Sequence, residues 1–368
     1  MNNSALLHIV ERLEGFLGKL PDSIRKPVLN ELTPLKELFL QQRSPCFVLT
    51  GSHPMPLLDF VARIFADDGD KAPSRETLTG LFRWQTIALG QHGSIQMLDA
   101  RGANDAALDL VREALQQQPA DLFFFLPAEH AAKVATRNEM ERLEKLLTWN
   151  GSGAVGAKLI ELQTSGSASG LKQELDSPAI RASFVGIYSL GPTLRRALAS
   201  DLPNEARVEL VRSGGDRHAQ AEIAELLVKS TSAICVAIGA QPIPLADLPV
   251  LTTLQLVMVS GIMYISGRER SLRAATEFVG AIGANVGLGM IFREGARAAL
   301  KFFPGWGNVV CGMVAGAGTF AIGRAATVYF IEGATLQDAR RAFLKSKKKS
   351  IPLPGKKPRA LRAPRSKS

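Results

Sequence analysis

Between residues 45 and 200, short apolar runs alternate with amphipathic stretches that repeat with helical spacing. The runs of strand length are 46–51, 82–89, 94–102, 121–127, 157–163 and 184–191. This alternation predicts an α/β domain, a mostly parallel sheet with helices on both faces. Runs 82–89 and 94–102 differ because only the four residues Gly90 to Gly93 separate the two. So short a link predicts a hairpin, and therefore one antiparallel pair.

The regions on either side have helical patterns. Residues 1–44 carry apolar side chains at spacings of three and four, and Pro21-Asp22-Ser23 divides them into two predicted helices. We expect this N-terminal helical segment to pack against the neighbouring domain, with self-association as the alternative. Residues 201–334 are poor in charge and rich in Gly and Ala, and we expect them to form a separate, all-α hydrophobic domain.

Two uncharged stretches in this second domain are long. Residues 248–267 and 302–323 contain 20 and 22 residues without a charge, and about 20 apolar residues cross a bilayer as a helix. We expect a membrane hairpin with both termini in the cytoplasm. A surface-lying or re-entrant hairpin and a wholly soluble helical bundle are the alternatives. Gly283–Gly287 and Gly312–Gly316 have the G-x-x-x-G spacing that lets helices approach closely.

The net positive charge of the chain comes from its C-terminal end. The net charge is +10, and residues 345–368 contain ten Lys and Arg and no acid, so residues 1–344 are formally neutral. A basic folded surface for nucleic acid is therefore not indicated. We expect residues 335–368 to form a basic, disordered tail that binds anionic lipid headgroups.

Cysteines and histidines give no metal or redox motif. Cys46, Cys235 and Cys311 lie far apart in the sequence, and no two of the five histidines have metal-ligand spacing. We therefore expect no metal site and a reducing compartment, with Cys46 in the core. The N-terminus lacks the basic and apolar regions of a signal peptide, so we expect a protein that is not secreted.

The first apolar run ends at Gly51 and precedes a predicted helix, which is where a phosphate-binding loop would lie. The pattern G-x-x-x-x-G-K-[ST] placed on residues 51–58 retains only Gly51. Pro56 has no N–H, and Leu57 and Leu58 replace the cation and the magnesium-binding hydroxyl. Ser52 and His53 are candidates for a rebuilt phosphate site, but a solvated loop is the expectation.

Further motifs follow in order along the chain. Asp99-Ala100-Arg101-Gly102 has the D-x-x-G pattern, and Tyr188-Ser189-Leu190-Gly191 ends the last apolar run. The C-terminal half adds segments 240–249, 252–255, 292–295, 303–308 and 315–326. Over about residues 45–334 the chain resembles the Era/Der-like small GTPases, in the bacterial branch fused to a helical, membrane-associated domain of unknown function.

The resemblance implies a P-loop GTPase-like fold in which Asp99 and Gly102 face the γ-phosphate and magnesium and Ser189 packs on guanine. The family's N-K-x-D motif is missing after run 157–163, and so are the P-loop Lys and Ser. The resemblance therefore implies a degenerate member. Its nucleotide-binding residues reduce to Gly51, Asp99, Gly102 and Ser189, with no catalytic residue and no cofactor; GTP and magnesium are not expected to bind.

We therefore expect a membrane-associated pseudo-GTPase that acts as a binding or scaffolding component at the cytoplasmic side of the bacterial inner membrane. Its expected partners are anionic lipid headgroups, an unidentified protein and a second copy of the chain; nucleic acid is not expected. Two alternatives stay open, an active GTP-hydrolysing protein that combines Asp99 with residues of a partner, and a ribosome- or RNA-associated factor. The missing lysine and hydroxyl favour a non-enzyme.

Overall fold

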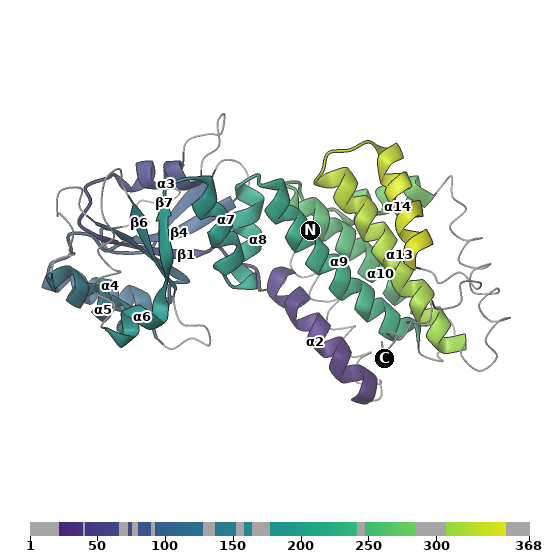
Figure 1. Cartoon of the computed structure of the whole chain (residues 1–368), viewed down its shortest axis with the longest axis horizontal. Coiled ribbons are helices and arrows are strands. Elements are labelled where there is room, and N and C mark those ends of the chain that lie inside the picture. Colours follow the sequence, from purple (N-terminus) through teal and green to yellow (C-terminus); the bar gives the residue numbers. More distant parts are fainter. Residues whose placement is uncertain are drawn as a thin grey trace, which may run out of the picture.

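The computed structural model describes ten segments of the chain, residues 22–39, 41–65, 73–75, 80–89, 93–127, 137–151, 158–163, 177–240, 247–283 and 307–350. They form an α/β domain and a helical bundle that lie side by side (Figure 1). The remaining residues, including the C-terminal segment 351–368, lie outside the described part.

The α/β domain is built on a seven-stranded sheet of order β2-β3-β4-β1-β5-β6-β7. The strands are β1 (Cys46–Gly51), β2 (Ser74–Arg75), β3 (Gln85–Leu89), β4 (Gly93–Asp99), β5 (Leu122–Leu126), β6 (Lys158–Gln163) and β7 (Phe184–Ser189). From β4 to β7 all neighbours are parallel. The hairpin of β3 and β4 is antiparallel, as predicted. The prediction of one antiparallel pair was too low, because β2 adds a second against β3.

Helices cover both faces of this sheet. Helices α3 (Leu57–Phe65) and α7 (Pro192–Asp201) lie on one face, and α4 (Asp105–Gln117), α5 (Arg137–Trp149) and α6 (Pro178–Ser183) on the other (Figure 1). Alternate residues of each central strand enter opposite cores, so Phe47 packs under α3 whereas Val48 packs under α4 and α5. Because both sides are covered, β5 is buried along its whole length.

The bundle consists of α2 (Asp22–Phe39), α8 (Asn204–Ser213), α9 (Arg217–Gly239), α10 (Asp247–Ile265), α11 (Leu272–Gly283), α13 (Gly307–Phe330) and α14 (Leu336–Ser350). Helix α2 lies along α9, where Leu32 packs against Ile234 and Ile238. This confirms that residues 22–39 form a helix that packs on a neighbouring part of the same chain. The first predicted helix, within residues 1–21, lies outside the described residues.

Glycines allow α13 to approach α9 closely. A Cβ atom added to Gly312 would lie 2.5 Å from the Val236 carbonyl oxygen, and one added to Gly316 would lie 2.1 Å from Val236 Cγ2. Gly323 meets Val228 in the same way. The G-x-x-x-G spacing at Gly312 and Gly316 therefore marks a close helix–helix contact. The second member of the other pair, Gly287, lies outside the described residues.

The two predicted membrane spans correspond to α10 and, from Gly307 onward, to α13. Within the described segments, no helix combines the length and hydrophobicity that crossing a bilayer requires. The apolar character of α13, whose one charged residue is Arg324, has a counterpart in its packing, because Ala321, Ala325 and Ala326 are fully buried inside the bundle.

The prediction of a disordered tail from residue 335 onward was wrong for residues 336–350, which form α14. Ala339 and Phe343 are fully buried on the bundle, and the Arg340 guanidinium donates to the Ala281 carbonyl at the end of α11. This segment is basic overall, but it also has apolar residues at helical spacing on one face. Burial of that face stabilises the helix, whereas a disordered tail buries no such face.

A cluster of polar side chains ties the linker before β1 to the bundle at α8. The Tyr264 hydroxyl and the Gln42 amide both donate to the Glu209 carboxylate. The guanidinium carbons of Arg212 and Arg270 lie 4.0 and 4.2 Å from the centre of the Tyr264 ring. Burial and the adjacent Glu209 carboxylate raise the pKa of Tyr264. The linker before β1, α8, α10 and the loop after α10 are thereby tied together. This set is called the junction cluster below.

Candidate functional site

A cleft of about 400 Å³ opens where β1 and β4 end. It is lined by Thr50, Gly51, Ser52, His53, Pro54, Asp99, Ala100, Arg101, Gly102, Leu108, Glu139, Arg142 and Leu146. The chain reaches β4 on one side of β1 and then crosses to β5 on the other. Ligands of open α/β sheets bind at such a reversal, beside the carboxyl ends of the strands.

Three of the four residues predicted to bind nucleotide line this cleft, namely Gly51, Asp99 and Gly102. Ser189 does not. It ends β7, which is separated from β1 by β5 and β6, and it pairs in register with Gln163 of β6. The structure thus gathers the phosphate-side residues of the predicted site and leaves the guanine-side residue apart from them.

Gly51 serves the contact between β1 and β5. Its φ angle is +106°, and a Cβ atom at this position would lie 2.2 Å from the Leu126 carbonyl oxygen. The same oxygen accepts hydrogen bonds from the backbone N–H groups of Ser52 and His53, each at 3.2 Å. Only glycine combines this backbone conformation with this close approach. Gly51 therefore has a structural reason to be glycine that involves no phosphate.

The loop after Gly51 has its backbone donors engaged within the protein. Besides Ser52 and His53, Met55 donates its N–H to His53 Nδ1 at 3.1 Å, and Pro54 and Pro56 have none to give. Convergent free N–H groups are what a phosphate-binding loop offers its ligand. The expectation of a solvated loop was wrong for His53, whose side chain is buried.

Arg101 closes the floor of the cleft. Its guanidinium makes a two-pronged ion pair with Asp99, through Nε to Oδ1 at 2.9 Å and Nη2 to Oδ2 at 2.7 Å. Nη1 donates to the carbonyl oxygens of His53 at 2.8 Å and Met55 at 2.7 Å. Only 13% of the Arg101 side chain is exposed. The D-x-x-G pattern does not identify Arg101, because any residue is allowed at its position in the pattern.

The polarity of the site follows from these contacts. Two carbonyl oxygens and a carboxylate point inward where a phosphate loop presents N–H groups, so the site favours a cation. The four oxygen atoms that contact the Arg101 guanidinium, both of Asp99 and the carbonyls of His53 and Met55, are called the cradle below.

Helix α5 contributes two further charged residues to the cleft, which the sequence analysis did not identify. Glu139 is half-buried and Arg142 is exposed, and both line the cleft. Arg142 has no hydrogen-bond or ion-pair partner among the residues that the structure describes. The stretch containing both reads only as an amphipathic helix, because a helix pattern does not reveal which strand ends the helix will cover.

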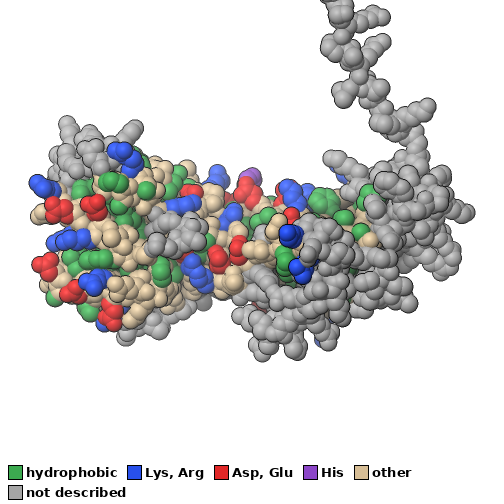
Figure 2. Space-filling view, turned by 90° about the horizontal axis from the view of Figure 1, so that it is seen from below, with side chains coloured by type: hydrophobic (Ala, Val, Ile, Leu, Met, Phe, Trp, Pro, Cys, Tyr) green, Lys and Arg blue, Asp and Glu red, His purple; other side chains and the backbone are tan. Residues whose placement is uncertain are grey.

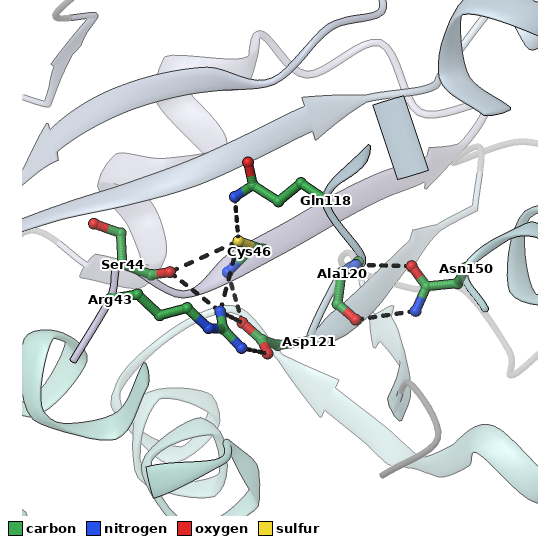
Figure 3. A network of polar contacts seen from close by, with 7 residues as sticks. All are labelled: Arg43, Ser44, Cys46, Gln118, Ala120, Asp121 and Asn150. Atoms are coloured by element: carbon green, nitrogen blue, oxygen red, sulfur yellow. Dashed lines mark hydrogen bonds and ion pairs between the residues drawn. The ribbon is translucent and has the colours of Figure 1, made fainter. Parts of the chain in front are cut away.

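Another polar network lies at the opposite end of the central strands, where β1 and β5 begin (Figure 3). Arg43 pairs with Asp121 at 2.6 and 2.7 Å, and Asp121 also accepts the Cys46 backbone N–H at 2.8 Å. The Gln118 amide donates to the Cys46 sulfur at 2.8 Å. Burial raises the pKa of the Cys46 thiol to about 11. A neutral, buried thiol is a core residue, as predicted, and a poor nucleophile.

This network joins three chain segments at the start of the strands. Asn150, after α5, forms two hydrogen bonds with the backbone of Ala120, one in each direction, as a neighbouring strand would (Figure 3). The arrangement has the satisfied, closed character of a structural network.

In the part of the chain that the structure describes, no three His, Cys, Asp or Glu side chains cluster closely enough to hold a metal ion. Comparison with models of known protein families finds none that matches the chain. A search of curated proteins finds no match either.

Proposed function

We propose that the α/β domain is a GTPase-like module that has lost nucleotide hydrolysis and acts as a binding or scaffolding component. The observation that carries this proposal is the position of Arg101, which fills the floor of the cleft and neutralises Asp99. A mostly parallel sheet with the cleft at the ends of β1 and β4 is compatible with a P-loop-like fold.

The chemistry of phosphoryl transfer explains why these residues count against catalysis. Hydrolysis of a nucleoside triphosphate depends on a loop of N–H donors, a lysine and a magnesium ion that together neutralise the phosphates. Here the N–H groups of Ser52 and His53 are bonded to Leu126. Leu57 stands at the lysine position, and Asp99 already has a guanidinium as its partner.

Binding of labelled GTP and ATP, with and without magnesium, tests the proposal directly. We expect no saturable binding in the micromolar range and no phosphate release. Asp99→Ala is the matched variant, because an active site with unusual residues would still need this carboxylate. Magnesium-dependent binding or turnover that disappears in Asp99→Ala, while the fold is unchanged by circular dichroism, would establish the active-enzyme alternative.

We further propose that the protein attaches to the cytoplasmic face of a membrane through its basic C-terminal region. Residues 345–368 supply ten basic side chains, each worth about 1 kcal/mol near an anionic bilayer. Phe343, buried on the bundle, anchors the helix from which this region continues. The face shown in Figure 2 instead mixes acidic and basic side chains over the α/β domain, which offers no basic stripe for nucleic acid.

Vesicle sedimentation tests this attachment. The full chain should pellet with vesicles containing anionic lipid, release at high salt, and pellet weakly with neutral vesicles. Deleting residues 345–368 should weaken pelleting. Equal pelleting with both kinds of vesicle would refute the electrostatic part of the proposal, and resistance to an alkaline wash of native membranes would indicate insertion of the bundle instead.

A further inference from the structure

We propose that the cradle is a guanidinium-binding site, which Arg101 fills from within the chain and from which an arginine side chain of a protein partner can displace it. The inference rests on the proposed function, since it assigns a partner to a cleft that no longer takes nucleotide. It makes Arg101 an autoinhibitory contact.

The geometry of the cradle matches a guanidinium group. Its four oxygens receive four of the five N–H donors of Arg101, at distances between 2.7 and 2.9 Å. The carboxylate of Asp99 takes the two parallel donors that a planar fork presents. An ammonium group has only three donors, arranged as a tripod, and cannot satisfy all four oxygens in this way.

The cleft leaves room for a second side chain beside Arg101. Its volume of about 400 Å³ is measured with Arg101 in place. Leu108 and Leu146 line it, and such apolar surface suits the methylene groups of an arginine whose charged end reaches a polar floor. Gly102 follows Arg101 with a φ angle of +66°, and no atom lies within 4 Å of the position that a Cβ would take there, so no packed side chain holds that side of the turn.

The positive charge of Arg142 at the cleft allows a test of whether the site binds a cation or an anion. The exposed guanidinium of Arg142 lies among the lining residues and repels an incoming cation. Removing it should therefore strengthen the binding of an arginine side chain. The same change would weaken the binding of a phosphate or carboxylate, so Arg142→Ala separates a cation site from an anion site.

The first experiment asks whether the cradle recognises guanidinium. Arg101→Ala should lower the melting temperature, and methylguanidinium should restore part of the loss in a saturable manner. Methylammonium is the matched control and should restore much less. Rescue should disappear when Asp99→Asn is added to Arg101→Ala. Equal rescue by the two cations, or none by either, would overturn the proposal.

The second experiment uses the wild-type chain, so it holds even if Arg101→Ala fails to fold. The Arg101 Nε–H signal, assigned in NMR spectra with Arg101→Lys, should move toward the position of a free arginine on titration with N-acetylarginine amide. The ligand must exceed the effective concentration of the tethered side chain, which is in the millimolar range for short tethers. N-acetyllysine amide should have little effect, and Arg142→Ala should lower the midpoint.

A signal that stays in place at saturating arginine amide would refute displacement. The nucleotide assay, run on the same samples, keeps the two proposals distinguishable. Magnesium-dependent GTP binding by the wild-type chain would overturn the proposed function, whereas failed rescue and failed displacement without GTP binding would overturn only the guanidinium site.

Discussion

Gly51 offers the sharpest test of how the cleft is built. In Gly51→Ala, the new Cβ atom would lie 2.2 Å from the Leu126 carbonyl oxygen, whereas ordinary contacts begin at 3.4 Å. The ends of β1 and β5 must then separate by about 1 Å. Two hydrogen bonds to Leu126 would weaken, each worth about 1 kcal/mol, and the backbone conformation adds about 2 kcal/mol of strain for a residue with a side chain. The lower entropy of the unfolded alanine chain offsets about 1 kcal/mol of this cost, so we expect a total loss of about 3 kcal/mol.

Gly102→Ala is the matched control. Gly102 also has a positive φ angle, +66°, but no atom lies within 4 Å of an added Cβ. The control therefore carries the conformational strain without the clash. We expect it to lose about 1 kcal/mol, because the strain is partly offset by the lower entropy of the unfolded alanine chain.

Urea denaturation followed by circular dichroism and tryptophan fluorescence measures both free energies of unfolding. Trp84 and Trp149 pack against the core of the α/β domain and report on its unfolding. The melting temperature should fall by roughly 10 °C in Gly51→Ala and by only a few degrees in Gly102→Ala. If the two variants lose the same stability to within about 0.5 kcal/mol, which is the usual scatter between independent sites, the close contact with Leu126 does not set the role of Gly51.

Three further predictions follow from other parts of the fold. Burial raises the pKa of both Cys46 and Cys235 to about 11, so at pH 8 iodoacetamide should modify neither until urea unfolds the chain, as peptide mapping would show. Partial burial alone would raise the pKa of Asp216, but the N–H groups that it caps at the start of α9 and the Arg196 guanidinium together outweigh this and lower the pKa. The stability that Asp216 contributes as a cap, about 1 kcal/mol, should be present above about pH 4 and lost as pH falls through the lower folded pKa. The difference in unfolding free energy between wild type and Asp216→Ala should shrink accordingly. Tyr264→Phe removes the hydroxyl that bonds Glu209 in the junction cluster and should cost about 1 kcal/mol, with faster amide exchange in α8. Unchanged exchange there would count against coupling of α8 to α10 through this residue.

The sheet of the α/β domain could be predicted because its strands are buried on both faces. Such strands read as continuous apolar runs, and 121–127 is the clearest of them. The hairpin of β3 and β4 could be predicted from the length of its link alone. Strand β2 could not, because Ser74 and Arg75 form a two-residue edge strand whose pairing depends on β3 being in place.

Helix α14 shows a different limit of sequence reasoning. Six Lys and Arg among the 15 residues of α14 suggest a solvated segment, yet Ala339 and Phe343 lie on one face and are buried against the bundle. Composition averages over the helix, whereas folding depends on the one face that meets a partner. Whether that face is buried depends on α13, which packs against α14, and composition does not reveal this contact.

The candidate site could be located but its chemistry could not be deduced from the motifs. Gly51 is required by the approach of β5, Asp99 is the counter-ion of Arg101, and Gly102 holds a φ angle of +66°. Each of these motif residues thus has a reason to be present that needs no nucleotide. Arg101, at a position where the motif allows any residue, supplies one positive charge and four hydrogen bonds at the place where a phosphate loop would turn its donors inward. Because a guanidinium is matched by acceptors and a phosphate by donors, the carbonyls of His53 and Met55 suit the Arg101 guanidinium and not a phosphate. The polarity of the cleft therefore depends on the direction of the His53 and Met55 carbonyls, which no residue pattern displays.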